Sequence, residues 1–301
     1  MLPVYLENLT HLQLKSRAEE LLELQKECRI CPWECLAKRH VGECGNCHST
    51  DAVIVSSIHP HFGEEPPLVG TNGSGTIFFS NCNLSCEFCQ NNEISHLGSG
   101  SIIKVEELAQ SMLKLQNQGC HNINFVTPTH FTPQIVSALV IAVEKGLEIP
   151  LVYNCGGYES LETLRLLDGI IDIYMPDIKY SNSKMAEKYS NAPKYWRVVT
   201  SAVKEMHRQV GDLKISKRGI AQRGLLIRHL VLPNNIAGSE RVLEFVVNEL
   251  SKDSYINIMD QYYPSFNAQN YPELNRRITP YEYEKIINYT RELGLHRGFN
   301  E

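Results

Sequence analysis

Residues 76–95 of this chain are Thr-Ile-Phe-Phe-Ser-Asn-Cys-Asn-Leu-Ser-Cys-Glu-Phe-Cys-Gln-Asn-Asn-Glu-Ile-Ser, and this segment gives the strongest indication of the fold. It begins with β-branched and aromatic residues, Thr76 to Phe79, which are typical of a buried strand. Three cysteines follow at the spacing C-x3-C-x2-C: Cys82, Cys86 and Cys89. They therefore lie on the loop that leaves the C-terminal end of the strand. In an α/β barrel, active sites are built at that end.

Three thiolates are an unusual number for a metal or redox site. A structural zinc site takes four ligands and a disulfide takes two. A cluster of four irons normally takes four cysteines, so three cysteines leave one iron open for a substrate or cofactor. Ordinary cysteines or part of a zinc knuckle are the alternative, because this spacing also occurs by chance.

The spacing, with the aromatic Phe88 directly before the last cysteine, resembles the signature of the radical SAM superfamily. The resemblance implies that Cys82, Cys86 and Cys89 are the catalytic centre and hold a [4Fe-4S] cluster. It also implies S-adenosylmethionine (SAM), chelated to the open iron by its amino and carboxylate groups. In that superfamily, reduction of the cluster cleaves SAM to a 5′-deoxyadenosyl radical, which abstracts a hydrogen atom. Flavodoxin or ferredoxin is then the expected electron donor.

The composition is that of a soluble globular protein with one large α/β domain or two smaller ones. The 301 residues are 43% apolar and 21% charged. Lysine plus arginine is 29 and aspartate plus glutamate is 34, so the net charge is −5, which argues against a broad nucleic-acid surface. The longest apolar stretch, 135–143, is too short to span a bilayer. Residues 1–9 lack the basic start of a secretory signal, so we expect a cytoplasmic protein.

Five of the ten cysteines lie close together near the N-terminus: Cys28, Cys31, Cys35, Cys44 and Cys47. The outer pairs have the C-x2-C spacing of zinc knuckles, and Cys35 is a fifth candidate, so which four would act is open. Clustered cysteines without a secretory signal are typical of metal ligands in a reducing cytoplasm. The sequence predicts a second metal here, either zinc or an auxiliary iron–sulfur cluster, and free thiols are the alternative.

From residue 74 onward, short apolar segments alternate with amphipathic ones, as in a parallel sheet built from β-α-β units. Six units predict an α/β fold, a partial (β/α)6 TIM-like barrel, which is also the fold that the resemblance implies. The expected strands are at 75–80, 122–127, 149–154, 170–175, 224–232 and 255–260. The expected helices are at 105–118, 133–145, 160–167, 183–209 and 239–250.

Residues 1–73 are predicted to be a cysteine-rich extension and residues 74–301 the barrel domain. The extension contains a helical run at 9–26 whose apolar side should pack on the barrel, and a strand at 53–58. Its connector at 59–68 is either a substrate loop or a solvated loop. Within the barrel, residues 213–222 predict an inserted hairpin, and Thr279 predicts the capped start of the last helix.

The expected strands end in polar residues, and these tips should face the cluster. SAM needs a cation for its carboxylate and acceptors for its ribose hydroxyls. Lys179 and Arg228 can serve the carboxylate, and Asp177 and Asn154 can serve the ribose or a nearby cation. The tips are at 127–130, 154–157, 177–179, 228–229 and 260–262.

Three longer motifs are similar to those of proteins related to the pyruvate formate-lyase activating enzyme: Gly-Ser-Gly-Thr-Ile-Phe-Phe-Ser-x-Cys, Cys-Gln-Asn-x-Glu-Ile-Ser and Met-Pro-Asp-Ile-Lys. Asp177 and Lys179 match the Asp-x-Lys motif of these activases, and Arg228 matches their strand-five arginine. The activases hold the amino group of SAM with Gly-Gly-Glu after strand two, where this chain has Thr-Pro-Thr-His at 127–130. Either Thr127 or His130 is expected to take over that contact.

The resemblance implies a glycyl radical site in a protein or peptide as one class of substrate. A small molecule or a nucleoside is the alternative within radical SAM enzymes. A non-catalytic scaffold, whose cysteines only brace the fold with bound metal, is the alternative from another class.

Overall fold

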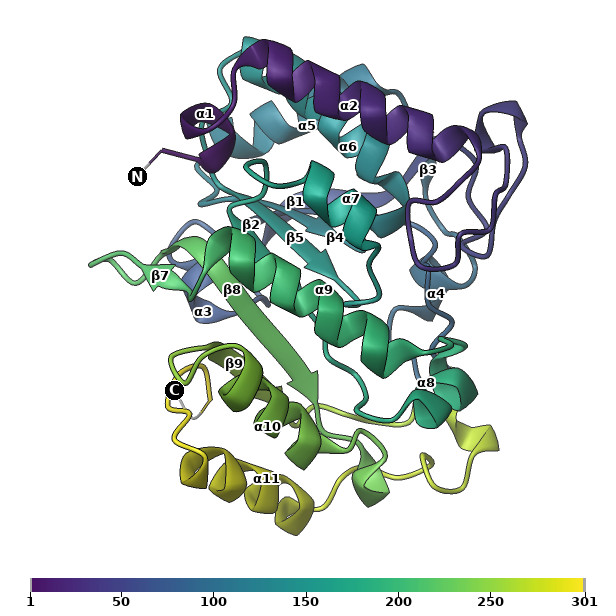
Figure 1. The fold of residues 1–301 in the computed structure, drawn as a ribbon, viewed down its shortest axis with the longest axis vertical. Helices are drawn as coiled ribbons and strands as arrows, with labels where there is room; N and C mark the ends of the chain where they lie inside the picture. The colour runs from purple at the N-terminus through teal and green to yellow at the C-terminus, as the bar shows by residue number, and fades with distance from the viewer. Residues whose placement is uncertain (1, 300–301) are drawn as a thin grey trace.

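One twisted sheet forms the centre of the molecule, which is a computed structural model that describes residues 2–299 (Figure 1). Within those residues the sheet has nine strands, and six of them are parallel neighbours. The six are β2 (Ser74–Phe79), β4 (Ile123–Val126), β5 (Leu151–Cys155), β6 (Ile173–Pro176), β8 (Ala221–Leu230) and β9 (Tyr255–Met259). The six predicted strands are therefore confirmed.

The sheet is open at one seam, so the barrel is partial, as predicted. Across the described residues, β9 pairs with β8 on one side and has no strand on the other. At the opposite edge, β1 (Val53–His61) pairs antiparallel with β2, and β3 (Ser101–Ile103) pairs antiparallel with β1. The strand expected at 53–58 thus joins the main sheet. The division of the chain at residue 73 stays a prediction.

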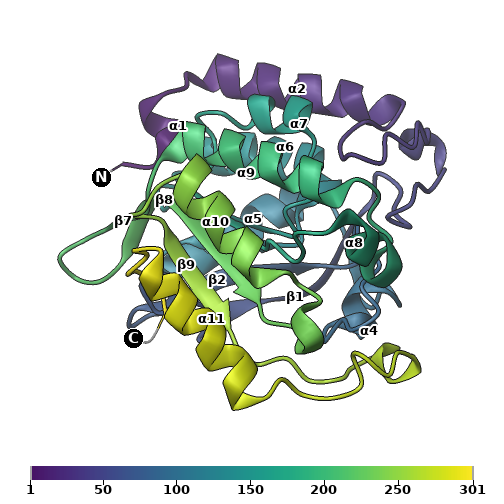
Figure 2. The same ribbon diagram turned by 60° about the horizontal axis from the view of Figure 1, so that its bottom comes forward.

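Helices cover the outer face of the parallel strands, as expected for right-handed crossovers (Figures 1 and 2). They include α5 (Val105–Asn117), α6 (Thr132–Glu144), α7 (Leu161–Leu166), α10 (Ser239–Glu249) and α11 (Pro280–Glu292). The single helix expected over 183–209 is two, α8 (Ser183–Ser190) and α9 (Tyr195–Val210). Asn191 and Lys194 have φ of 47° and 56°, which ends the first helix, and Pro193 between them donates no backbone hydrogen bond.

The N-terminal helix packs on the barrel, as predicted. Helix α2 (His11–Lys26) begins at Thr10, whose hydroxyl caps the helix, and it buries Leu14, Ala18 and Leu21. Its last turn reaches α6, where the amides of Gln25 and Gln134 exchange hydrogen bonds. Short helix α1 (Val4–Glu7) precedes it. No helix within residues 2–299 is long and apolar enough to cross a membrane.

The bottom of the barrel is closed by α3 (Pro66–Val69). Its Leu68 is fully buried in a small apolar cluster with Val152, Ile173 and other inward residues of the parallel strands. Asn122, directly before β4, donates a hydrogen bond to the carbonyl of Leu68 and so attaches α3 to that strand. The opposite end of the barrel, where the strands finish, is left for a binding site.

Two local predictions near the C-terminus are confirmed. Strand β7 (Lys214–Ile215) pairs antiparallel with β8, which makes the inserted hairpin. Thr279 caps α11, with Pro280 in the first turn and Glu282 completing the capping box.

Candidate active site

The cysteine loop leaves the C-terminal end of β2, where the sequence predicted it. Backbone hydrogen bonds tie the loop to α8: the N–H of Ser85 donates to the carbonyl of Ser190 and that of Glu87 to the carbonyl of Tyr189. At its end lies the short helix α4 (Asn92–Ser95). The loop is thus held between β2 and α8 at the open end of the barrel.

The three thiols of this loop are unpaired and each has a polar contact. The N–H of Leu84 donates to Sγ of Cys82 at 3.4 Å, and the hydroxyl of Ser190 donates to Sγ of Cys86 at 3.0 Å. Sγ of Cys89 lies 3.0 Å from the hydroxyl oxygen of Ser95. None of the ten cysteines of the chain, all within the described residues, forms a disulfide.

Burial controls the ionisation of these thiols. It raises the pKa of Cys82, and the neighbouring Cys86 thiolate would raise that pKa further. Burial likewise raises the pKa of Cys86 to about 11, although the Lys179 ammonium opposes the change. Both thiols are therefore protonated near neutral pH until a cation binds them, as is usual for metal ligands.

The three thiols are the residues that would hold an iron–sulfur cluster, which the sequence predicted here. Within residues 2–299, no three His, Cys, Asp or Glu side chains converge closely enough to bind one metal ion. A cluster of irons spreads its thiolates apart, because each thiolate binds a different iron. Cys82, Cys86 and Cys89 are close enough for each thiolate to raise the pKa of a neighbouring thiol, as three ligands of one cluster would be.

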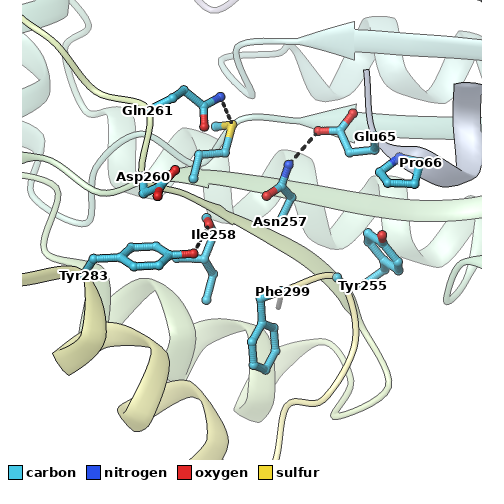
Figure 3. A pocket seen from close by; sticks show the side chains of 11 residues that line it. Glu65, Pro66, Tyr255, Asn257, Ile258, Asp260, Gln261, Tyr283 and Phe299 are labelled. Atoms are coloured by element: carbon cyan, nitrogen blue, oxygen red, sulfur yellow. Dashed lines mark hydrogen bonds between the residues drawn. The ribbon is translucent and has the colours of Figure 1, made fainter. Parts of the chain in front are cut away.

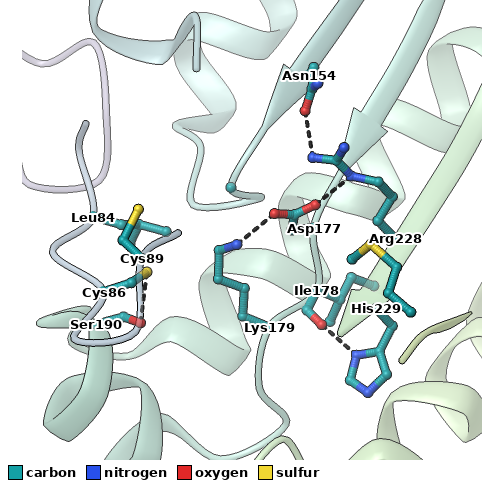
Figure 4. Close-up of polar contacts among 12 residues, drawn as sticks. Leu84, Cys86, Cys89, Asn154, Asp177, Ile178, Lys179, Ser190, Arg228 and His229 are labelled. Atoms are coloured by element: carbon teal, nitrogen blue, oxygen red, sulfur yellow. Dashed lines mark hydrogen bonds and ion pairs between the residues drawn. The ribbon is translucent and has the colours of Figure 1, made fainter. Parts of the chain in front are cut away.

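Charged side chains meet at the tips of β6 and β8, beside the cysteine loop (Figure 4). Asp177 accepts from Nζ of Lys179 at 2.5 Å and from Nε of Arg228 at 2.7 Å, using a different oxygen for each. Nη2 of Arg228 donates to the side-chain oxygen of Asn154 at 2.7 Å. The four polar residues that the sequence predicted to serve SAM are thus in one hydrogen-bonded group.

The ionisation of this group is set by its own ion pairs. Burial alone would raise the pKa of Asp177, but Arg228 and Lys179 outweigh burial and lower it to about 2. Burial alone would lower the pKa of Lys179 and of Arg228, but the Asp177 carboxylate raises both. All three side chains therefore carry charge across the physiological pH range.

The carboxylate of Glu64, to which the sequence assigned no definite role, also lies near this charged group. Glu64 lies in the predicted connector, and its carboxylate is 3.9 Å from Nη1 of Arg228 and 3.1 Å from Nδ1 of His61. The next residue, Glu65, is 6% exposed and accepts from Nδ2 of Asn257 at 3.0 Å. The connector therefore turns inward across the seam. The paired carboxylates were visible in the sequence, but nothing local indicated which way they face.

A cavity of about 220 Å³ lies beside the free edge of β9 (Figure 3). It is lined by Glu65, Asn257, Asp260 and Tyr283, among others. Gln90, directly after the last cysteine of the loop, donates to the carbonyl of Gln261 at 3.2 Å. The predicted polar tip of the sixth strand thus contacts the cysteine loop from the seam side.

The remaining predicted site residues, Phe88, Thr127 and His130, differ in how deeply they are buried. Phe88 is buried and its ring packs edge-on against Tyr180 and Tyr262. Thr127 is partly exposed, with a φ of 60°, and its N–H donates to the carbonyl of Asn154. His130 is 1% exposed and donates from Nε2 to the carbonyl of Ser80 at 2.8 Å.

His130 is therefore not brought to the charged group. Its other ring nitrogen, Nδ1, is also buried and has no hydrogen-bond partner among the described residues. Burial lowers the pKa of His130 to about 3, so the ring is neutral. The difference from the expectation arises because the 3-10 helix Thr129–Phe131 turns the side chain under the end of β2.

The comparisons with known proteins agree with this geometry. The family model described as the radical SAM superfamily matches residues 76–216. The uncharacterized protein MJ0674 of Methanocaldococcus jannaschii is 30% identical over 290 residues, which cover 94% of this chain and 79% of that protein.

Two solved structures match this chain, and the first of them has a similar fold. SuiB of Streptococcus suis bound to the precursor peptide SuiA matches with a TM-score of 0.50 and 12% identity, over 72% of this chain and 46% of SuiB. HydG, a maturase of the [FeFe]-hydrogenase, matches with a TM-score of 0.48 and 14% identity, over 72% of this chain and 48% of HydG. This chain thus spans about half the length of these two proteins. At such identities the likeness concerns the fold alone.

Proposed function

This chain belongs to the radical SAM superfamily, and from that premise we propose that it cleaves S-adenosylmethionine reductively to abstract a hydrogen atom from a substrate. One observation carries the proposal. Three unpaired thiols, those of Cys82, Cys86 and Cys89, lie beside a charged group at the open end of the barrel.

The three thiols are the proposed ligands of a [4Fe-4S] cluster, which the family implies. A cluster held by these three thiols would supply the one-electron reduction of the SAM sulfonium that breaks its C–S bond. The chain supplies the donors that stabilise the thiolates: the N–H of Leu84 at Cys82 and the hydroxyl of Ser190 at Cys86. Phe88 supports the loop from below through its contacts with Tyr180 and Tyr262.

Lys179 and Arg228 are the proposed partners of the SAM carboxylate. Nζ of Lys179 donates to a single acceptor, Asp177, and an ammonium has three N–H groups. Both oxygens of Asp177 are taken by these cations, so its proposed role is to hold them in place. Asn154 holds the guanidinium of Arg228 in the same way.

The amino group of SAM needs an acceptor in place of the glutamate of the activases. Thr127 is partly exposed at the tip of β4, so its hydroxyl is the proposed acceptor. The burial of His130 favours a structural role for that residue instead.

A glycyl radical site in a protein or peptide is the proposed class of substrate, supported by the activase-like Asp177 and Lys179. A small molecule or a nucleoside is the alternative substrate. Flavodoxin or ferredoxin is the proposed electron donor, and the cytoplasm the proposed location. The N-terminal cysteines are proposed to hold a second metal, zinc or an iron–sulfur cluster.

Product analysis of SAM tests the proposed activity. The full chain is purified without oxygen, reconstituted with iron and sulfide, reduced with dithionite and incubated with SAM. The expected product is 5′-deoxyadenosine. The Cys86→Ala variant should not form it. The matched control Cys120→Ala, whose cysteine lies outside both cysteine loops, should form it like the parent. Zinc without iron, and intact SAM, would instead identify a metal-binding scaffold.

A further inference from the structure

The Cys82 loop, residues 80–91, begins with a residue in an unusual main-chain conformation. Asn81 lies between the end of β2 and Cys82, and its φ of 69° is in the left-handed region. Few residues other than glycine adopt this region, although asparagine tolerates it better than most. The N–H of Asn81 donates to the carbonyl of Ile94 at 2.9 Å. This conformation turns the chain out of the strand and so sets the direction in which Cys82 leaves β2.

The side chain of Asn81 is buried and is bound by a distant part of the chain. It is 6% exposed, and its Nδ2 donates to the carbonyl of His48 at 3.2 Å and to the hydroxyl of Ser49 at 2.9 Å. Both N–H groups of the amide are therefore used. The two acceptors belong to residues 27–52, called here the N-terminal loop, which contains the five N-terminal cysteines.

Cys82 is held in a similar way on its other side. Asn83 is 2% exposed, and its Nδ2 donates to the carbonyl of Tyr158 at 2.8 Å. The carbonyl of Asn83 accepts from Nε1 of Trp33, again in the N-terminal loop, at 2.8 Å. Both neighbours of Cys82 are therefore bound to the N-terminal loop, one through its side chain and the other through its main chain.

The N-terminal loop is itself closed and attached to the barrel. The N–H of Cys28 donates to the carbonyl of residue 37, and the N–H of residue 36 donates to the carbonyl of Cys28. Arg39 is 0% exposed, and its Nε and Nη2 donate to the carbonyl of Thr50 at 3.1 and 2.6 Å. Nη1 of Arg39 donates to the main-chain carbonyl of His130, after β4, at 2.6 Å. The loop is thus a fixed support for whatever it contacts.

The other two cysteines of the Cys82 loop have different partners. Sγ of Cys86 accepts from the hydroxyl of Ser190 in α8, and Sγ of Cys89 lies beside the hydroxyl of Ser95 in α4. These contacts do not involve the N-terminal loop. Loss of the contacts to that loop should therefore affect Cys82 before the other two thiols, which separates a local effect from general unfolding.

We propose that Asn81 is a positioning residue for Cys82 and that the N-terminal loop holds it in place through His48 and Ser49. Without the two side-chain hydrogen bonds, the left-handed main chain would relax to a conformation of lower energy and Cys82 would move. The segment 48–49 is a firm anchor because it directly precedes Thr50, which the buried guanidinium fixes. The role in catalysis rests on the proposed function, in which Cys82 binds a cluster, whereas the contacts themselves do not.

Thiol alkylation of the metal-free full chain tests the positioning role without a cluster. Asn81→Gly keeps access to the left-handed conformation and loses both side-chain hydrogen bonds, and Ser49→Ala loses one of them. Iodoacetamide should alkylate Cys82 about fivefold faster in Asn81→Gly, the factor expected for the net loss of one hydrogen bond, and by a smaller factor in Ser49→Ala. Mass spectrometry of each peptide measures the rates, which should stay at parent values for Cys86 and Cys89.

Asn234→Gly is the matched control. Asn234 also has a left-handed φ, of 58°, and its Nδ2 donates to the carbonyl of Glu273 at 2.8 Å, far along the chain from the Cys82 loop. This variant should alkylate at Cys82 like the parent. An unchanged Cys82 rate in Asn81→Gly or in Ser49→Ala, an equal rise at all three cysteines of the loop, or the same rise in Asn234→Gly would each overturn the proposal.

A second measurement connects the position of Cys82 with the cluster. After anaerobic reconstitution, Asn81→Gly should keep the iron content of the parent, and the electron paramagnetic resonance signal of its reduced cluster should differ because one ligand is no longer fixed. An unchanged signal would overturn the role of Asn81 in positioning a cluster ligand. Absence of iron from the parent would count against the proposed function instead, and the alkylation rates would still decide whether Asn81 positions Cys82.

Discussion

The two cysteine loops of this protein differ in their position relative to the sheet and in the exposure of their thiols. The Cys82 loop follows a parallel strand and ends at the mouth of the barrel, with Cys82 and Cys89 partly exposed. The N-terminal loop lies outside the sheet, and three of its thiols are buried. A loop at a strand end presents its ligands to a substrate, whereas a loop closed on itself surrounds them. The same residue type thus stands at the mouth of the barrel in one loop and is mostly buried outside the sheet in the other.

The largest expected effect separates the two loops directly. Cys86→Ala should abolish SAM cleavage, because the open cluster loses one of its three ligands. The metal proposed for the N-terminal loop, zinc or iron, should remain in the same variant. Cleavage is measured as 5′-deoxyadenosine formed, and iron by chemical analysis. Full cleavage by this variant would falsify the assignment of Cys86 as a ligand.

A buried carboxylate below the N-terminal loop should make stability depend on pH. Burial raises the pKa of Glu159 from 4.5 to about 7, although Thr129 and Tyr153 oppose the change by hydrogen bonds. Because the folded-state pKa is raised, the contribution of Glu159 to stability is complete below pH 4.5 and is lost as pH rises through 7. The shift corresponds to about 3 kcal/mol in the free energy of unfolding.

Glu159→Gln should therefore be less sensitive to pH than the parent between pH 4.5 and 7. Urea unfolding at several pH values measures the difference. Asp172, whose pKa burial also raises to about 7, contributes equally to both proteins and cancels. Glu162→Gln, at an exposed position on α7, is the control and should follow the parent. Parallel curves for the parent and Glu159→Gln would contradict the prediction.

A smaller effect is expected at the open site. Arg228→Ala removes a buried, charge-assisted contact worth about 1.5–3 kcal/mol, so SAM affinity should fall roughly tenfold or more. The iron content should stay unchanged, since the hydrogen bonds and ion pairs of Arg228 within residues 2–299 are with Asp177, Asn154 and Glu64 and not with the cysteines. Calorimetric titration with SAM measures the affinity, with the exposed Arg208→Ala as the control. Unchanged affinity in Arg228→Ala would exclude Arg228 as a SAM contact.

The smallest effect on SAM binding is expected at His130. His130→Ala should leave SAM affinity unchanged and lower the free energy of unfolding by about 1–3 kcal/mol, because a buried ring and its bond to Ser80 are lost. Thr127→Ala should do the reverse, with weaker SAM binding and little loss of stability. A SAM affinity that falls in His130→Ala but not in Thr127→Ala would restore the histidine to the site.

Features that depend on short segments could be predicted from the sequence alone. The strands and the cysteine loop after Phe79 follow from local patterns of β-branched, aromatic and cysteine residues, and the cap of α11 follows from Thr279 and Glu282, three residues apart. The polar ends of parallel strands must meet at one edge of a sheet, so the grouping of Asp177, Lys179, Arg228 and Asn154 could also be predicted.

Features that depend on the direction of a side chain, or on contacts between distant segments, became visible only in the folded protein. Glu64 reaches Arg228 because the connector turns across the open seam, and His130 is buried because a single 3-10 turn rotates it away from the site. Cys47 is buried whereas Cys44 is exposed, although the two belong to the same C-x2-C pair. Spacing along a chain limits which residues can meet, but packing of distant segments determines which of them do.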